Sequence, residues 1–332
     1  MKDIQKATGL GLATISKYIN GGSVRPATKA LLDQAIEELG YRRNETARAL
    51  KTSRTKTIGV LIPELNNLFS TAIVSSVEDS LRHLGYAVLV CDCRSDPMLE
   101  RQAVEFLLSK RVDGILNMPV SADGSHLIPA ERAGIPVVLI DRKVERKGFD
   151  AVIIDNRAAA QEAVARLAGA GHRRIGLICG GGDVYTFRER RAGYAAALAC
   201  GGIAHHPELD RPTAHTMNGG YGEMKRLLAL KPSISAVFVA NYEMTLGAVI
   251  AANEAGVKMP GALSFIGFDN LELSRAMTPR LTTVAQPMDE IAAAATELMM
   301  DALGGEGSQR RTVMLEARLV EGASVGEPPY IT

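Results

Sequence analysis

The chain has 332 residues, of which 46% are apolar and 23% charged, a composition typical of a globular protein of two or three domains. No apolar run approaches the roughly 18 residues of a membrane span, and the basic N-terminus has no signal-peptide core. We therefore expect a cytoplasmic protein with no membrane partner, and its four cysteines are too sparse for a disulfide scaffold.

The net charge of +1 conceals an asymmetry along the chain. Residues 1–56 carry a net charge of +6, and the remainder carries −5. A basic head on a mildly acidic body indicates a polyanionic partner for the head alone. The alternative is that the basic residues of the head form an ordinary solvated surface with no polyanionic partner.

Residues 2–40 contain three short helical patterns, each followed by glycine. They cover residues 2–8, about 12–20 and about 26–39. Two helices joined by a short turn that contains glycine form a helix-turn-helix, whose second helix enters the major groove of DNA. We therefore expect a DNA-binding domain over residues 1–43.

The two faces of this unit differ in chemistry. Five apolar residues are expected to form its small core: Ile4, Ala7, Leu10, Ile15 and Ile19. Six residues are left for DNA: Leu12, Ala13, Thr14, Ser16, Lys17 and Asn20. Hydroxyl, amide and ammonium groups contact phosphates or base edges, and the apolar side chains contact thymine methyl groups. Many helical hairpins have no DNA role, so the pattern alone leaves that alternative open.

Two segments, KDIQKATGLGLATISKYING and EELGYRRNETARALKT, resemble the opening of the LacI/PurR (LacI/GalR) family of bacterial transcriptional regulators. The family patterns are roughly Asp-Val-Ala-x-x-Ala-Gly-Val-Ser-x-x-Thr-Val-Ser-Arg-Val-Leu-Asn and Leu-Gly-Tyr-x-Pro-Asn-x-x-Ala-Arg-x-Leu. The chain departs from them at Lys17, where the family has arginine, and at Arg43, where it has proline. The loop after the second helix is about one residue shorter. These departures concern docking geometry and leave the class unchanged.

Residues 44–56 are expected to form a hinge helix and linker. The segment 44–52 has helix-forming composition behind a suitable N-cap, Asn44, but it is shorter than the roughly 12–15 residues that an isolated helix needs in water. The resemblance implies that it orders on DNA beside its twin. Leu50 matches the leucine that inserts into the minor groove, and Ala47 packs across the dimer axis. The alternative is a plain linker with one stray leucine.

From residue 57 onward, short apolar runs alternate with amphipathic helical stretches. This alternation predicts parallel sheets with helices on both faces, and the pattern restarts near residue 151, which indicates two Rossmann-like lobes. The resemblance implies a core like the type I periplasmic binding proteins, an α/β fold in which the chain crosses between the lobes three times. The first lobe is expected to comprise about 57–155 and 286–315, and the second about 156–285 and 316–327.

Ligands of such sheets bind at the carboxyl ends of the strands. That rule selects the segment 63–70, the Gly180 loop and five polar residues: Asp141, Arg142, Asp155, Asn156 and Asn241, with Asp269 after the last long run. The resemblance implies that Arg188 clamps the effector and that Asn241 and Asp269 also bind it. Ser70 stands after Phe69 where the family often has an aromatic residue, and His215 stands where purine-binding relatives have a stacking ring. The loss of one stacking ring favours a sugar or sugar acid over a nucleobase.

Each of these residues also has a structural interpretation. Asp155 and Asn156 are suited to cap the following helix, Asp269 and Arg188 to form an ion pair, and Asp141 and Arg142 to serve the hinge between the lobes. The sequence does not choose between these alternatives.

No motif indicates catalysis, a cofactor or a metal site. The CGGGD segment fits neither the dinucleotide-binding nor the phosphate-loop spacing, and His205, His206 and His215 lack neighbouring ligands. We expect a homodimeric repressor of near-palindromic operator DNA, controlled by a small metabolite. The alternatives are a sugar-binding transport protein or a sugar-modifying enzyme of similar core. A tetramer would usually need a C-terminal heptad repeat, and EGASVGEPPYIT has none.

Overall fold

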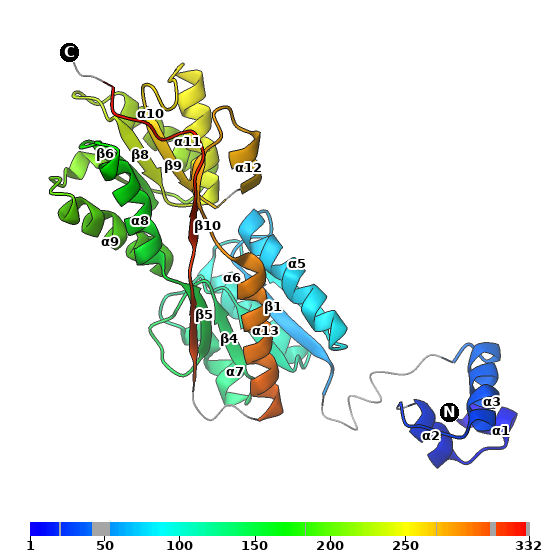
Figure 1. The fold of residues 1–332 in the computed structure, drawn as a ribbon. Helices are drawn as coiled ribbons and strands as arrows, with labels where there is room; N and C mark the ends of the chain where they lie inside the picture. Colours follow the sequence, from blue (N-terminus) through cyan, green and yellow to red (C-terminus); the bar gives the residue numbers. More distant parts are fainter. Residues whose placement is uncertain (20, 42–53, 183, 270, 306–309, 330–332) are drawn as a thin grey trace. The chain divides into compact units, whose positions relative to one another are not determined.

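The computed structural model describes residues 1–19, 21–41, 54–182, 184–269, 271–305 and 310–329. The chain divides into two compact units, Met1–Thr55 and Lys56–Thr332 (Figure 1). Within the described residues, no helix is both long and apolar enough to span a membrane.

The first unit is a small helical head with helices α1 (Lys2–Thr8), α2 (Leu12–Ile19) and α3 (Pro26–Glu38), as the three helical patterns predict. Gly9 ends α1 in the left-handed conformation, with φ of 67°, which glycine adopts without strain. Pro26 occupies the first turn of α3, where its missing N–H leaves no helical bond unmade.

The core of the head differs from the expected one at a single position. Ile4 and Ile15 are buried, and Leu10 and Ile19 pack against them, as expected. Ala7, by contrast, is exposed. A two-turn helix buries only a narrow stripe, and here that stripe is centred on Ile4. Leu32 and Ala35 of α3 complete the cluster in its place.

The second unit contains two six-stranded sheets. The sheet of lobe 1 has the order β11-β5-β4-β3-β1-β2, and that of lobe 2 has the order β12-β10-β9-β8-β6-β7. All neighbours pair in parallel except β12, which runs antiparallel to β10. The chain passes between the sheets three times, after β5, β10 and β11.

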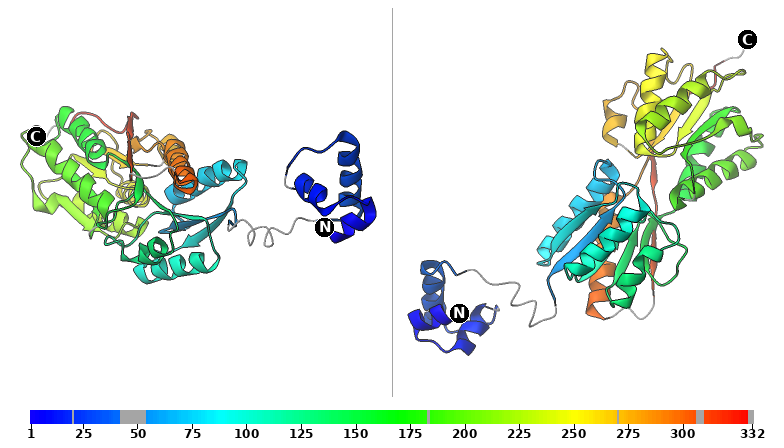
Figure 2. Two further views of the ribbon diagram at one scale, coloured as in Figure 1. Left: turned by 90° about the horizontal axis from the view of Figure 1, so that it is seen from below. Right: turned by 180° about the vertical axis from the view of Figure 1, so that it is seen from behind.

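Lobe 1 comprises β1 (Thr57–Ile62), α5 (Leu68–His83), β2 (Ala87–Asp92), α6 (Pro97–Ser109), β3 (Gly114–Asn117), the 3-10 turn η1 (Ser125–Leu127), α7 (Ile128–Arg132), β4 (Val137–Ile140), β5 (Asp150–Ile154), α13 (Met288–Gly304) and β11 (Thr312–Leu315). Helices α5 and α13 pack side by side on one face of its sheet, and α6 and α7 lie on the other (Figures 1 and 2). Alternation along β1 produces this division, because Ile58 and Val60 join one apolar cluster while Leu61 joins the other.

Lobe 2 comprises α8 (Asn156–Gly169), β6 (Ile175–Gly180), α9 (Tyr185–Cys200), η2 (Pro207–Leu209), β7 (Asp210–Thr213), α10 (Met217–Leu228), β8 (Ala236–Val239), α11 (Tyr242–Glu254), β9 (Ser264–Phe268), α12 (Leu271–Ala276), β10 (Thr282–Ala285) and β12 (Arg318–Val320). Helix α8 packs on α9, and α10 packs on α11. The central strands are buried throughout, as both faces of the sheet are covered.

Candidate functional site

The carboxyl ends of strands from both lobes surround one polar cavity. Its walls are formed by fifteen residues: Pro63, Asn67, Phe69, Ser70, Met118, Asp141, Arg142, Thr186, Phe187, Arg190, His215, Asn241, Tyr242, Asp269 and Gln286. Six of the seven expected cleft residues are among them; the exception is Arg188. A larger, mainly apolar cavity lies beside α5, α12 and α13 and shares Asp269 and Gln286 with this one, but Asp141 and Arg190 line only the smaller cavity.

Two aspartates occupy equivalent places in the two lobes. Asp141 follows β4 and Asp269 follows β9, each the third strand in its sheet order. Both have left-handed backbones, with φ of 68° and 63°, which non-glycine residues rarely adopt. Strained backbones of this kind concentrate at functional sites, because the surrounding fold must hold them.

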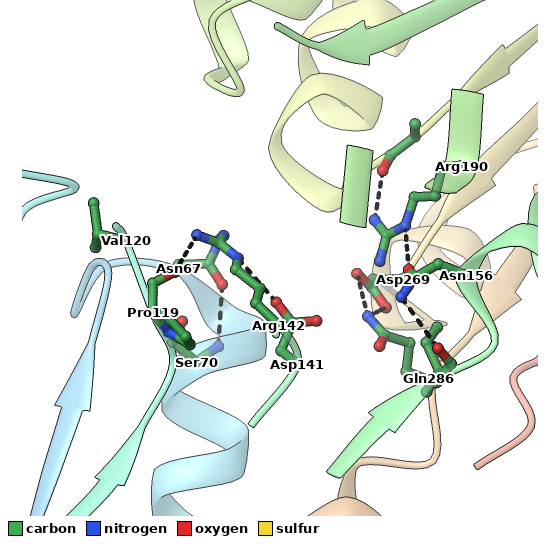
Figure 3. A network of polar contacts seen from close by, with 12 residues as sticks. Asn67, Ser70, Pro119, Val120, Asp141, Arg142, Asn156, Arg190, Asp269 and Gln286 are labelled. Carbon is green, nitrogen blue, oxygen red and sulfur yellow. Dashed lines mark hydrogen bonds and ion pairs between the residues drawn. The ribbon is translucent and has the colours of Figure 1, made fainter. Parts of the chain in front are cut away.

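On the lobe 1 side, two polar groups are held in place by their neighbours. Arg142 donates from Nε to Asp141 at 3.2 Å and from Nη1 to the Pro119 carbonyl at 3.1 Å (Figure 3). Asn67 caps α5 by accepting from the Ser70 N–H, and its amide donates to Glu243 of lobe 2 at 3.1 Å. The Asn67–Glu243 bond therefore joins the two lobes beside the cavity.

On the lobe 2 side, Arg190 is a buried cation, with 3% of its surface exposed to solvent. Its Nε donates to Asn156 Oδ1 at 2.8 Å and its Nη1 donates to the Ala240 carbonyl at 2.6 Å (Figure 3). The guanidinium also lies over the Phe268 ring, 3.6 Å from its centroid. Nη2 makes no hydrogen bond within the described residues, which leaves it available to a ligand.

Asp269 lies buried beside this cation. It accepts two hydrogen bonds from Gln286 Nε2, at 3.0 and 3.2 Å. Burial raises the pKa of Asp269 from 3.8 to about 6, against the opposing effects of Arg190 and of the Gln286 hydrogen bond. The other amide atom of Gln286, Oε1, is buried and finds no partner in the part of the chain that the structure describes. An unsatisfied acceptor of this kind is suited to a hydroxyl donor from a ligand.

An aromatic wall completes the cavity. The His215 and Phe187 rings lie with their centroids 5.6 Å apart. Burial, with a smaller effect of Arg142, lowers the pKa of His215 and favours its neutral form. Asn241 caps α11 by accepting from the Met244 N–H at 2.9 Å, and its amide donates to the His215 carbonyl at 3.4 Å.

In the head, α2 presents a mixed surface. Leu12, Ala13 and Lys17 are exposed, Thr14 and Ser16 are half-buried, and Ile15 faces the core. A Cβ at Gly22 would lie 2.6 Å from Lys17 Cγ, so the loop after α2 requires glycine there. The remaining residues expected to bind DNA, Asn20, Asn44, Ala47 and Leu50, lie outside the described residues.

Comparison with known proteins gives matches along the whole chain. Residues 164–325 match the periplasmic binding protein-like domain. The chain is 32% identical to the HTH-type transcriptional repressor PurR of Edwardsiella ictaluri, over 100% of this chain and 98% of that protein. The chain belongs to the LacI/GalR family of transcriptional regulators.

Two solved structures extend this assignment to the fold. The Lac repressor dimer bound to operator and the anti-inducer ONPF has a TM-score of 0.87 and 25% identity, and the match covers 98% of both chains. The transcriptional regulator CelR in complex with cellobiose has a TM-score of 0.75 and 28% identity, with 97% and 98% covered. The expected fold class, a helical head and a two-lobe periplasmic-binding-protein-like core, is therefore confirmed. This LacI/GalR regulator is a DNA-binding transcriptional repressor with an effector-binding core, not an enzyme.

The structure does not place Arg188 in the cleft of this regulator. Its side chain is 56% exposed and lies 3.6 Å from Glu189. A helix turns about 100° per residue, so a residue two positions away faces nearly the opposite side. Arg190 is therefore the arginine of α9 that lines the cavity, and the alternative of an Arg188–Asp269 ion pair finds no support among the ion pairs of the described residues.

A signal for Arg190 was present in the sequence. The buried residues of α9 include Phe187, Arg190, Tyr194 and Ala197, which recur at helical spacing. Gly193 lies on the same face, where a Cβ would approach the Arg157 carbonyl of α8 to 2.3 Å. Gln286 left no such signal, because the strand before it, TTVA, contains two threonines and does not stand out as an apolar run.

Among the remaining candidates, Asp155 acts as a helix cap. It accepts from the Ala158 N–H at 2.9 Å and does not line the cavity. Asn156 accepts a hydrogen bond from Arg190 and does not itself line the cavity. The Gly180 loop does not line the cavity either. No group of three or more His, Cys, Asp or Glu side chains is arranged to hold a metal ion in the described ranges.

Proposed function

We propose that this repressor acts in the cytoplasm as a homodimer and that a sugar or sugar derivative, bound between its lobes, controls its affinity for a near-palindromic operator. Helix α2 of each protomer reads one half-site in the major groove. Leu50 and its twin insert into the minor groove at the operator centre, with Ala47 packing between them and Asn44 capping the hinge helix. The basic charge of residues 1–56 supplies the phosphate contacts.

Roles on the DNA follow from the chemistry of the side chains in and directly after α2. Thr14, Ser16, Lys17 and Asn20 donate to phosphates or base edges. Leu12, which is 43% exposed, and Ala13 contact thymine methyl groups. Large apolar side chains are costly to leave in water, so an exposed leucine at this position is consistent with a contact surface.

The observation that carries the effector proposal is the convergence of unsatisfied polar groups from both lobes on one cavity. Gln286 offers a buried acceptor, and Arg190 offers a donor that is held rigidly by Asn156 and the Ala240 carbonyl. A polyhydroxylated ring satisfies such groups once water is excluded. The CelR relative was solved with cellobiose, which supports the same ligand class here.

Control of DNA binding requires that the effector distinguish two arrangements of the lobes. The ligand touches lobe 1 through Asp141 and lobe 2 through Asp269, so it favours one relative pose. Lobe 1 continues directly from the hinge segment, and a change in its pose alters whether two hinge helices can pair. A useful response needs about 1–3 kcal/mol of coupling between the sites.

The first experiment selects randomised duplex DNA on the purified full-length protein and on its Leu50→Ala variant. Leu31→Ala, which removes an exposed leucine from α3, serves as the matched control. We expect a palindrome with a pyrimidine–purine step at its centre, weakened by Leu50→Ala and unchanged by Leu31→Ala. No enrichment, in the presence or absence of pooled metabolites, would show that the head does not read sequence.

The selected operator then becomes the probe for effectors. Sugars, sugar acids and nucleosides are tested for release or enhancement of operator binding. The nucleosides are included because the Phe187–His215 wall also presents a face on which a flat heterocycle stacks. A response to nucleosides alone would show that the effector is a nucleoside and not a sugar.

A further inference from the structure

Outside the effector cleft, the described core holds a buried carboxylate, Glu100, beside a buried histidine in lobe 1, and the function above does not use them. Glu100, on α6, has no exposed surface, and both of its carboxylate oxygens are occupied. Oε1 accepts from the Val120 N–H at 2.8 Å, and Oε2 accepts from the Ser121 N–H at 2.8 Å and the Ser121 hydroxyl at 2.6 Å. One carboxylate thus holds two successive backbone amides of the segment that follows β3.

This segment leads directly to the cleft. Residues 118–121 lie outside helices and strands; the Met118 N–H donates to the Leu61 carbonyl of β1 at 2.9 Å, and the amides of Val120 and Ser121 donate to Glu100. Met118 lines the cavity, and the Pro119 carbonyl accepts from Arg142 Nη1 (Figure 3). Because Pro119 has no N–H of its own, the next amides that can fix its carbonyl are those bound to Glu100. The position of the Arg142 guanidinium therefore depends on a carboxylate that does not touch the cavity.

A buried histidine adjoins the same carboxylate. His126 Nε2 lies 3.2 Å from Glu100 Oε1 and 2.9 Å from the amide nitrogen of Asn117. The Asn117 Oδ1 atom and His126 Nδ1 have no partner among the described residues. Turning the Asn117 amide by 180° places Oδ1 beside Nε2–H, which then donates to both oxygens, and Nδ2 takes the former place of Oδ1.

We propose that Glu100, backed by His126, is a positioning residue of the effector cleft: it fixes residues 119–121 and so holds Arg142 beside Asp141. Long, flexible side chains lose much entropy on binding, and an arginine held in advance spares the ligand that cost. The inference rests on the proposed function, since it assigns Arg142 to the same cleft.

The test observes Arg142 without any ligand. The full-length protein is labelled with 15N-arginine, and the exchange of each Nε–H with water is measured by NMR. Arg142→Lys and Arg190→Lys assign the two signals. In Glu100→Gln, the amide group faces one of the two backbone N–H donors, so the segment loosens. We expect the exchange of the Arg142 Nε–H to rise by about tenfold, while that of Arg190 in lobe 2 stays within about twofold.

Glu131→Gln is the matched control, because it makes the same change in the same lobe. Glu131 binds Arg146 at the surface, so this variant should move the Arg146 signal and leave Arg142 unchanged. If Glu100→Gln does not fold, Ser121→Ala removes only the hydroxyl bond and should raise the exchange of Arg142 by about threefold. An Arg142 signal unchanged in these variants, or an equal change at Arg190, overturns the proposal.

A pH series adds a readout that general loosening would not produce. Burial lowers the pKa of His126, while Glu100 and Asp123 oppose that effect and Arg101 adds to it. As the pH falls through this value, a charged His126 binds Glu100 more strongly, and the Arg142 signal should shift. His126→Gln should abolish that shift, and a shift that persists in this variant contradicts the role of His126.

A measurement with a metabolite distinguishes failure of this inference from failure of the proposed function, on which it rests. For a metabolite that shifts operator binding in the screen, Glu100→Gln should raise the concentration required by about tenfold and leave operator affinity in its absence unchanged. If no metabolite acts, the proposed function fails, and the exchange rates of Arg142 still decide the positioning role.

Discussion

At the residue scale, the cleft is built around two buried ions that do not form a close pair. Arg190 is fixed by the neutral oxygens of Asn156 and Ala240, and Asp269 is fixed by the amide of Gln286. Buried ions without a close partner are costly, and proteins keep such groups mainly where function needs them. The two charged groups therefore serve ligand binding in the cleft rather than the stability of the fold.

The two arginines of α9 make a matched pair for testing the clamp. Arg190→Lys should raise the effector concentration for half-maximal response by about tenfold or more. Lysine has a single ammonium group, which cannot bind Asn156, the Ala240 carbonyl and a ligand in the fixed planar geometry of a guanidinium. Arg188→Lys makes the same change on the exposed face and should alter that concentration by less than about twofold. Fluorescence anisotropy on the selected operator measures both. An equal rise in this concentration in both variants would contradict the assignment of the effector clamp to Arg190 rather than Arg188.

Asp269 makes stability depend on pH in a defined direction. Its pKa in the folded chain, about 6, exceeds the ordinary value of 3.8, so the ionised form is disfavoured by folding. That cost is absent below about pH 4 and complete above about pH 6. Asp269→Asn should therefore raise the free energy of unfolding by about 1–3 kcal/mol at pH 7–8 and by almost nothing at pH 4.

Denaturant unfolding at several pH values measures this gain. The surface control Glu105→Gln should change the free energy of unfolding by less than about 0.5 kcal/mol at each pH. A gain at Asp269 that is independent of pH would mean that the carboxylate is not the source of the cost.

At the element scale, polar residues at the carboxyl edge of the sheets cap the N-termini of helices as well as line the cleft. Asn67 caps α5, Asp155 caps α8 and Asn241 caps α11, each accepting from a backbone N–H. Asn67 and Asn241 also line the cavity, whereas Asp155 does not. A polar residue after a strand is therefore ambiguous in sequence, because capping and ligand binding ask for the same side chains.

Asp155 tests the capping role by itself. Asp155→Ala should lower the free energy of unfolding by about 1 kcal/mol, because the Ala158 N–H loses its acceptor. The effector response should be unchanged. Asp155→Ser retains a capping oxygen and should recover most of the loss. A weakened effector response in the alanine variant, with normal stability, would assign Asp155 to the cleft instead.

At the scale of the whole molecule, three crossings between the sheets let the lobes change pose while each sheet keeps its pairing. The cleft lies beside these crossings, and the Asn67–Glu243 bond spans it. Interfaces of this kind favour discrete arrangements over continuous deformation. Under the proposed function, the effector acts on residues 44–56 by moving lobe 1 as a rigid body.

Coupling between cleft and operator must be reciprocal. If an effector weakens operator binding by a given factor, saturating operator must weaken effector binding by the same factor, about 5- to 150-fold for typical regulators. Calorimetric titration of the effector, with and without the operator duplex, measures it. A scrambled duplex is the control. Release of operator with no change in effector affinity would show that release does not pass through the cleft.

The sequence by itself determined the class of this protein. The head helices and eight of the strands appear as local patterns, since burial of one face or of a whole strand leaves a period in the chain. The effector cleft was predicted as a region for the same reason, because strand ends follow recognisable strands. Asp141, Asn241 and Asp269 were found in this way, and they line one cavity.

Only the tertiary structure decided which side chains meet there. Strands β7, β10, β11 and β12 are three or four residues long and each includes a polar residue, and a neighbouring strand supplies their hydrogen bonds. Gln286 follows one of them, and Arg190 replaced Arg188 through the orientation of α9 on α8. Periodicity records which face of an element is buried, whereas the register of distant elements depends on contacts that no local stretch of sequence contains.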